Sequence, residues 1–170
     1  GKLPITIPES ISHLPDYEDY SMNNRTYRFT NYKPMFPFGF GLSYSSFIYS
    51  DLVVDKKNSE DGDSIMLNFN IRNNSKFLGE EVIQLYVKAM NAPFRTPNSS
   101  LKFFERINLQ PGEKRNINVL VNNDMLSSIN ENGDTEIVKG SYKIFIGGSS
   151  PGDRSAQLGK PVQEISFEIK

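Results

Sequence analysis

Residues 65–72 read Ile65-Met66-Leu67-Asn68-Phe69-Asn70-Ile71-Arg72, and this stretch decides the fold class. Ile, Leu, Phe and Ile take every second position, while Met, Asn, Asn and Arg take the positions between them. Because successive side chains of a β-strand point to opposite faces, a period of two predicts a strand with one buried face.

The same period recurs after Phe47. Alternating runs lie at 117–121, 142–146 and 165–169, with weaker candidates at 47–55 and 101–109, and residues 82–88 are apolar enough for a central strand. With turn signals between them, these seven candidates predict an all-β, two-sheet sandwich. One short helical turn is expected at 123–129, capped by Asp124. The predicted core consists of Leu67, Phe69, Leu85, Val87, Val119, Ile144 and Phe167.

Residues 1–46 differ from the rest and are expected to form a leader, followed by the sandwich at 47–170. Prolines at positions 4, 8, 15, 34 and 37 disfavour helix, so extended coil and turns are predicted. However, residues 17–49 hold 11 of the chain's 20 aromatic residues, whereas disordered linkers are poor in aromatics. The leader is therefore expected to pack against a surface.

The composition argues against several classes of function. The chain has 170 residues with 19 Lys plus Arg against 20 Asp plus Glu, which gives a net charge of −1. Such a balance provides no broad field to attract nucleic acid or an anionic membrane, so neither partner is expected. The absence of cysteine removes thiol catalysis and cysteine-based zinc sites.

Catalytic machinery is not apparent in the sequence. A glycosidase needs two carboxyl groups that face each other across a cleft. The adjacent acids here are expected to be solvated charges in turns and at strand ends: Glu18-Asp19, Asp61-Asp63, Glu80-Glu81 and Asp134-Glu136. His13, the single histidine, has no nucleophile in a recognisable motif beside it. We therefore expect no catalytic residue, no cofactor and no metal site.

Two further motifs favour structural roles. Residues 147–152 read Gly-Gly-Ser-Ser-Pro-Gly, but they lack the ending of a phosphate loop and no helix is expected after them, so a hairpin turn is predicted. Phe94, Phe103 and Phe104 could form a platform for sugar rings. Core packing is the favoured prediction for them, because it is the usual fate of phenylalanine.

The leader carries the most specific strings. Residues 17–22 read Tyr-Glu-Asp-Tyr-Ser-Met, 25–29 read Arg-Thr-Tyr-Arg-Phe, and 34–44 read Pro-Met-Phe-Pro-Phe-Gly-Phe-Gly-Leu-Ser-Tyr. They resemble the C-terminal region of family 3 glycoside hydrolases of the β-glucosidase and β-xylosidase type. Residues 1–8 resemble the end of that family's α/β sandwich domain. Residues 79–87, 101–113 and 140–150 resemble strands of its fibronectin type III-like domain.

The sequence departs from the family pattern at two places. Phe103 stands where the family usually has Gly, and Asn98-Ser99-Ser100 stand where a Pro-Val type of lead is usual. These departures concern the loop at residues 91–101.

The resemblance implies a fibronectin type III-like, immunoglobulin-like β-sandwich and a non-catalytic accessory role. In this family the nucleophilic Asp belongs to an N-terminal barrel and the acid/base Glu generally to the α/β domain, so neither maps onto these residues. The implied parent is a retaining β-glycosidase, periplasmic or secreted. The implied partner is the set of catalytic domains of the same parent chain, and the candidate docking residues are Tyr27, Arg28, Phe36, Pro37, Phe38, Gly39, Phe40, Gly41, Leu42 and Tyr44.

Two expectations about the leader follow. Residues 34–46 are expected to pack on the edge of the sandwich. The strip Tyr17–Phe29 is expected to meet the catalytic domains of the parent and, without them, to be mobile or held by a neighbouring molecule. The alternative to a docking domain is a free-standing protein-interaction or carbohydrate-binding module with a weak carbohydrate contact.

A first prediction concerns activity. Because no pair of carboxyl groups has the arrangement of a glycosidase, the 170-residue chain should not hydrolyse aryl β-glucosides or aryl β-xylosides. The measurement is release of the aryl alcohol against a buffer blank. Turnover that survives repurification of the chain would contradict the prediction.

Overall fold

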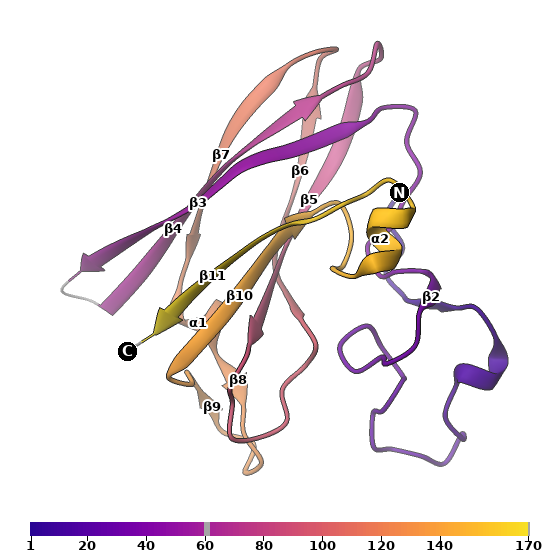
Figure 1. Cartoon of the computed structure of the whole chain (residues 1–170), viewed down its shortest axis with the longest axis vertical. Coiled ribbons are helices and arrows are strands. Elements are labelled where there is room, and N and C mark those ends of the chain that lie inside the picture. The colour runs from indigo at the N-terminus through magenta and orange to yellow at the C-terminus, as the bar shows by residue number, and fades with distance from the viewer. Residues whose placement is uncertain (60–61, 170) are drawn as a thin grey trace.

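The computed structural model describes residues 1–59 and 62–169, and their side-chain environments at 1–55 and 65–169. Two antiparallel sheets pack face to face (Figure 1). One sheet has the order β11-β10-β5-β6, with bounds Gln163–Ile169, Gly140–Gly147, Gly79–Ala89 and Ser100–Leu109. The other has the order β3-β4-β7, with bounds Phe47–Ser59, Gly62–Asn73 and Lys114–Val121. The predicted all-β sandwich is confirmed.

The period of two in β4 places its apolar side chains in the core. Ile65, Leu67, Phe69 and Ile71 are at most 3% exposed. Antiparallel pairing sets Leu67 opposite Val119 and Phe69 opposite Ile117 of β7, so both strands present their apolar residues to the same face. All seven residues predicted for the core are buried in one hydrophobic cluster.

Strand β5 is buried on both faces. Ile83, Leu85 and Val87 belong to the core between the sheets. Gln84 and Tyr86 point to the opposite face of the sheet, yet they are only 3% and 0% exposed. Because only two layers make up the sandwich, this outer face is covered by something else, and that cover is the leader (Figure 1).

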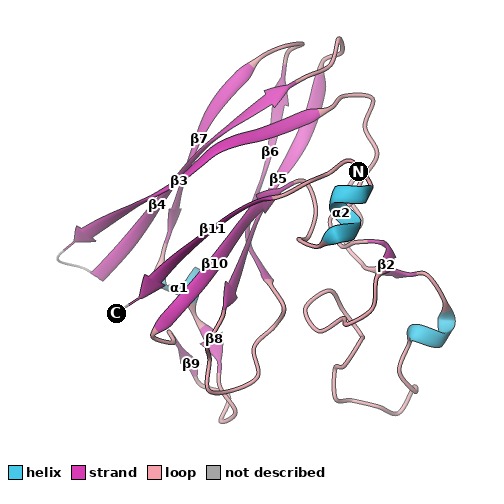
Figure 2. Cartoon of the chain, viewed as in Figure 1, coloured by secondary structure: helices cyan, strands magenta, loops and turns pink. Residues whose placement is uncertain are grey.

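The leader is mostly loop and includes a helical turn and the short strand β2 (Pro34–Phe36) (Figure 2). Strand β1 (Ile7–Pro8) pairs with β2, and the 3₁₀ turn η1 covers Ile11–His13. At one end of the sandwich, β8 (Ser128–Ile129) pairs with β9 (Thr135–Glu136) (Figure 1). In the described residues, no helix is long and apolar enough to cross a membrane.

The prediction of a hairpin turn at 147–152 is wrong. The chain leaves β10 at Gly147 and forms helix α2 (Asp153–Gln157) before it enters β11. Five residues are too few to form a helix from propensity alone. Tertiary contacts hold it instead: Ser155 Oγ donates to Ser150 O at 2.6 Å, and Arg154 Nε donates to Met35 O of the leader at 3.0 Å.

The expected helical turn near 123–129 is present as α1 (Asn123–Leu126), but its cap is one that the sequence analysis missed. Asn122 is the N-cap, because its side-chain oxygen accepts from Met125 N at 3.0 Å. Asp124 lies inside the first turn.

A second prediction tests the core. Phe69→Ala should lower the free energy of unfolding by about 3–5 kcal/mol, because it removes a side chain that is 1% exposed and leaves a cavity. Phe104→Ala, at a residue 68% exposed, should change it by less than about 0.5 kcal/mol. Denaturant unfolding measures both, and equal effects would show that the assignment of Phe69 to the core is wrong.

Candidate functional site

The leader is a closed arm and not a straight linker. Leu3 N donates to Phe40 O and Gly39 N donates to Leu3 O, both at 2.8 Å. The pairing of Ile7 with Phe36 continues this contact outward. Residues 4–38, called the arm below, therefore leave the sandwich and return to the same place (Figure 1). The expectation of extended coil missed this closure, since backbone pairing across 37 residues has no local sequence signal.

The base of the arm is bonded to the outer face of β5. Gln84 Nε2 donates to Gly39 O at 3.1 Å and to Gly148 O at 2.9 Å, and Tyr86 Oη donates to Gln84 Oε1 at 2.5 Å. Burial raises the pKa of Tyr86, so its hydroxyl stays protonated as a donor. Gly39 has φ +77°, and a Cβ there would lie 1.9 Å from Gln84 Oε1. Only glycine therefore allows this approach.

A buried ion pair joins the first residues to the same strand. Lys2 Nζ lies 2.5 Å from Glu81 Oε1 and donates to Gly148 O at 2.8 Å, while the Glu81 side chain is 2% exposed. Burial lowers the pKa of Lys2, and the neighbouring Glu81 carboxylate opposes that shift. Since an unpaired buried carboxylate is strongly unfavourable, Glu81 depends on the leader for its partner.

Aromatic rings of the arm cover the rest of this face. The ring of Tyr27 stacks on Phe38 with centroids 4.4 Å apart and meets the edge of Tyr86 at 5.8 Å. Its hydroxyl accepts from Leu101 N of β6 at 2.9 Å. Phe36 and Phe40 stack at 5.3 Å. These contacts attach the arm to two strands of the sheet.

The loop after β5 holds the outer part of the arm. The Arg95 guanidinium lies over the Phe29 ring at 4.7 Å, and Arg95 also donates to Ser21 O at 3.1 Å and to the side chain of Asn23. Asn98 N donates to Arg28 O at 2.6 Å. Tyr27 and Phe29 therefore do not stand off from the sandwich, in contrast to the expectation for this strip. No sequence signal linked Arg95 to residues more than 70 positions away.

The ten docking candidates divide into two groups. Pro37, Gly39, Phe40 and Gly41 are buried, and Tyr27, Phe36 and Phe38 are partly buried against the sandwich. Arg28 is exposed, and Leu42 and Tyr44 are 87% and 98% exposed. Gly39 thus contacts the outer face of β5, which is an inner strand of its sheet, and the chain turns outward between Gly41 and Ser45.

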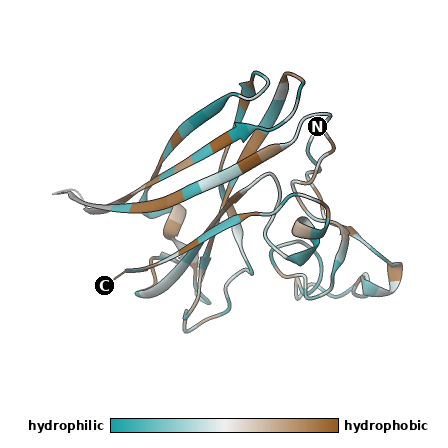
Figure 3. Cartoon of the chain, turned by 45° about the horizontal axis from the view of Figure 1, so that its top comes forward, coloured by the Kyte–Doolittle hydropathy of each residue, from teal (hydrophilic) through white to brown (hydrophobic). Residues whose placement is uncertain are grey.

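The far end of the arm presents apolar side chains to solvent. Figure 3 shows an apolar segment there. We call this set the arm tip, and its members are Ile11, Leu14, Tyr17 and Tyr20, which are 85%, 48%, 90% and 85% exposed. The sequence analysis found the two tyrosines through their string but missed Ile11 and Leu14.

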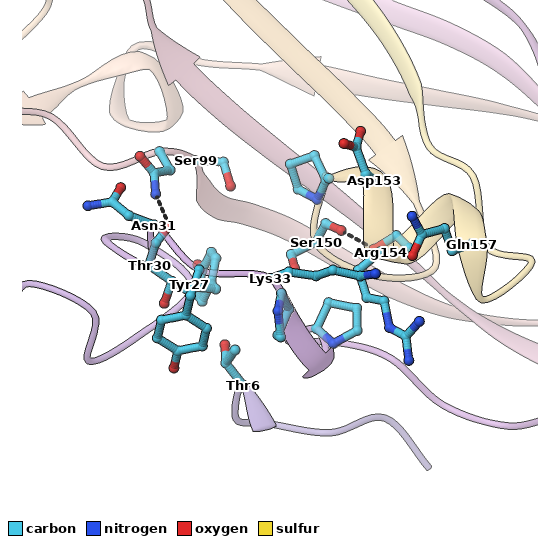
Figure 4. A pocket seen from close by; sticks show the side chains of 17 residues that line it. Thr6, Tyr27, Thr30, Asn31, Lys33, Ser99, Ser150, Asp153, Arg154 and Gln157 are labelled. Carbon is cyan, nitrogen blue, oxygen red and sulfur yellow. Dashed lines mark hydrogen bonds between the residues drawn. The ribbon is translucent and has the colours of Figure 1, made fainter. Parts of the chain in front are cut away.

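A cleft of about 380 Å³ lies between the arm, the start of β6 and helix α2. Figure 4 shows the polar side chains around it. Its lining includes Thr6, Tyr27, Lys33, Ser99, Asp153 and Arg154. Asp153 is the acidic residue among those that line it, so the described residues place no pair of carboxyl groups across this cleft.

The acidic pairs and His13 have other environments. Glu80 faces Arg106 at 3.5 Å on the surface, and Glu81 holds Lys2. His13 stacks on Tyr32 with centroids 4.8 Å apart. Asp61 and the side chain of Asp63 lie outside the described residues. Within the described part of the chain, no three His, Cys, Asp or Glu side chains gather as a metal site would require.

Comparison with known proteins identifies the relatives of this fold. The model of the family "Fibronectin type III-like domain" matches residues 81–150. Thermostable β-glucosidase B of Acetivibrio thermocellus is 36% identical over 164 residues, which cover 88% of this chain and 22% of that protein. A putative β-xylosidase of Formosa agariphila is 36% identical over 156 residues, covering 88% and 20%.

The solved structure of a family 3 β-glucosidase from Bifidobacterium adolescentis shares the fold. Its TM-score is 0.78 at 24% identity, over 98% of this chain and 26% of that one. The chain therefore spans about a fifth to a quarter of the length of its relatives.

A third prediction tests how the arm is held. Arg95→Met removes the contact with Phe29 and the hydrogen bond to Ser21 O. Tryptic cleavage after Arg25 and Arg28 should therefore become about fivefold to tenfold faster, since roughly 1–1.4 kcal/mol of local stability is lost. Arg106→Met removes another exposed arginine, at the Glu80 surface pair, and should leave this rate unchanged. Equal rates in the two variants would show that Arg95 does not hold the arm.

Proposed function

Because the chain belongs to the fibronectin type III-like C-terminal region of family 3 glycoside hydrolases, we propose that it is a non-catalytic accessory domain of a longer β-glucosidase or β-xylosidase. Its role in the parent is to stabilise the assembled enzyme by docking against the catalytic domains. The observation that carries this proposal is the arm tip, a group of apolar side chains held out in solvent by a fixed support.

The support for the arm tip argues for docking and against a loose linker. Arg25 Nε donates to Asp19 O at 2.8 Å, so the segment that carries Tyr17 and Tyr20 is bonded across its own turn. Arg95 then ties that turn to the sandwich. A surface ordered before binding loses less conformational entropy when it docks.

The greater length of the relatives indicates which partner the arm tip would contact. About four fifths of the Acetivibrio and Formosa proteins lie outside the matched region. Exposed aromatic groups of this kind mark surfaces that another protein surface covers. The rest of the parent chain, which in this family carries the catalytic domains, is the partner that we propose for the arm tip. In that parent, β-linked glucosides or xylosides would be hydrolysed with retention by residues outside this chain.

The carbohydrate-binding alternative rests on the polar cleft between the arm and α2. Its aromatic rings are already engaged, because Tyr27 stacks on Phe38 and Tyr32 stacks on His13. On the sandwich, Phe103 packs against the core and Phe104 stands alone at 68% exposed. The rings that line this cleft are thus stacked on other rings, and Phe104 has no second exposed ring beside it on the sandwich, so docking is the function that the geometry supports best.

A fourth prediction tests the docking role. In the parent enzyme, Tyr17→Ser with Tyr20→Ser should speed thermal inactivation by about tenfold or more, because two aromatic rings worth about 1.5–3 kcal/mol each would no longer be buried. The kcat of enzyme not yet inactivated should not change, since the arm tip is proposed to stabilise and not to catalyse. Activity before heating measures the kcat, and residual activity after timed heating measures the rate of inactivation.

The matched control is Ile129→Ser, at a residue 65% exposed on the separate β8–β9 hairpin, and it should leave the inactivation rate unchanged. A loss of kcat without faster inactivation in the tyrosine variant would place the arm tip in the catalytic machinery. No change in either quantity would mean that the tip does not dock.

A further inference from the structure

A second apolar surface lies at the other end of the leader. Leu42 and Tyr44 are 87% and 98% exposed, and Phe77 and Leu78 are 62% and 53% exposed. The two segments are neighbours, because Ser45 Oγ donates to Phe77 O at 3.2 Å. Leu42, Tyr44 and Leu78 line one hollow of about 350 Å³, which we call the N-terminal hollow.

Gly1 and Lys2 form part of the wall of this hollow. The backbone of Gly1 passes close to Gly41, since a Cβ on Gly41 would lie 2.3 Å from Gly1 O. Lys2 is held by Glu81, and the Glu80–Arg106 pair lies at the same hollow. An apolar centre with charged groups around it has the composition of a protein interface.

We propose that the N-terminal hollow seats the part of the parent chain that directly precedes Gly1, so that Leu42, Tyr44 and Leu78 become buried against it. The inference rests on the proposed function, since it needs the longer parent. It names a second docking surface for that parent, distinct from the arm tip. In Figure 1 the N-terminus lies beside the sandwich, whereas the turn η1 marks the far end of the arm.

The position of Gly1 in the wall of the hollow is the reason for choosing the preceding segment as the occupant. Gly1 lines the hollow together with Leu42 and Tyr44, so a segment bonded to its nitrogen begins beside them. The buried Lys2–Glu81 pair and the Leu3–Phe40 hydrogen bond hold the next two residues against the sandwich and the base of the arm. A preceding segment therefore needs no long linker to reach this surface.

The experiment compares Tyr44→Ser in the 170-residue chain and in the parent enzyme. Tyr44 is 98% exposed in the chain alone, so the substitution should leave that chain's Tm unchanged. In the parent it should lower the Tm by about 2 °C or more, because the ring would be buried there. Hydrogen exchange at residues 42–45 and 77–78 should also be slower in the parent than in the chain alone. Ile129→Ser is the control and should alter neither protein.

Each outcome of this experiment either supports or overturns the proposed role of the N-terminal hollow. An unchanged Tm in the parent, or equal exchange at the hollow in both proteins, overturns the inference. If the chain alone forms a dimer that Tyr44→Ser abolishes, a second copy is the occupant and the inference is also overturned. The arm-tip variant Tyr17→Ser with Tyr20→Ser separates the two proposals, because it tests docking at a place that Tyr44 does not reach. If only one of the two variants destabilises the parent, the surface that it alters is retained as a docking surface and the other is rejected.

Discussion

The outer face of β5 is the constraint on which the rest of the structure depends. A central strand buried on both faces requires a second cover, and here its outer side chains, Gln84 and Tyr86, are polar. Buried amides and hydroxyls need hydrogen-bond partners. Gly39 O and Gly148 O supply them, one from the leader and one from the chain after β10. The leader is thereby part of the folded unit.

The Lys2–Glu81 pair makes this dependence mutual. Glu81 belongs to the sandwich but has its counter-ion on the second residue of the leader, and Gly148 accepts from the same ammonium group. A buried pair of this kind contributes little net stability, yet loss of one partner is costly. We infer that its effect is to specify one position of Lys2, next to the base of the arm.

These anchors explain how a domain without apparent catalytic residues would contribute to the larger enzyme that we propose as its parent. The arm carries Tyr17 and Tyr20 away from the sandwich while Arg95 and Asn98 hold it from the side. The N-terminal hollow faces the place where a preceding domain would join. With two surfaces fixed relative to each other, the sandwich can act as a rigid support between parts of one parent chain, which is the role that we propose.

The sequence by itself determined the features that depend on a local repeat or on a long, specific string of residues. The period of two at Ile65–Ile71 and in the runs after it predicted the sandwich and its core, and the string at 34–44, together with the other strings, indicated the family. Tertiary structure alone decided the closed arm, helix α2, the Lys2–Glu81 pair and the exposure of Leu42 and Tyr44. The physical reason is separation along the chain: Lys2 meets Gly148 across 146 positions and Arg95 meets Ser21 across 74. Such contacts leave no periodic trace, because each depends on where two distant backbones come to lie.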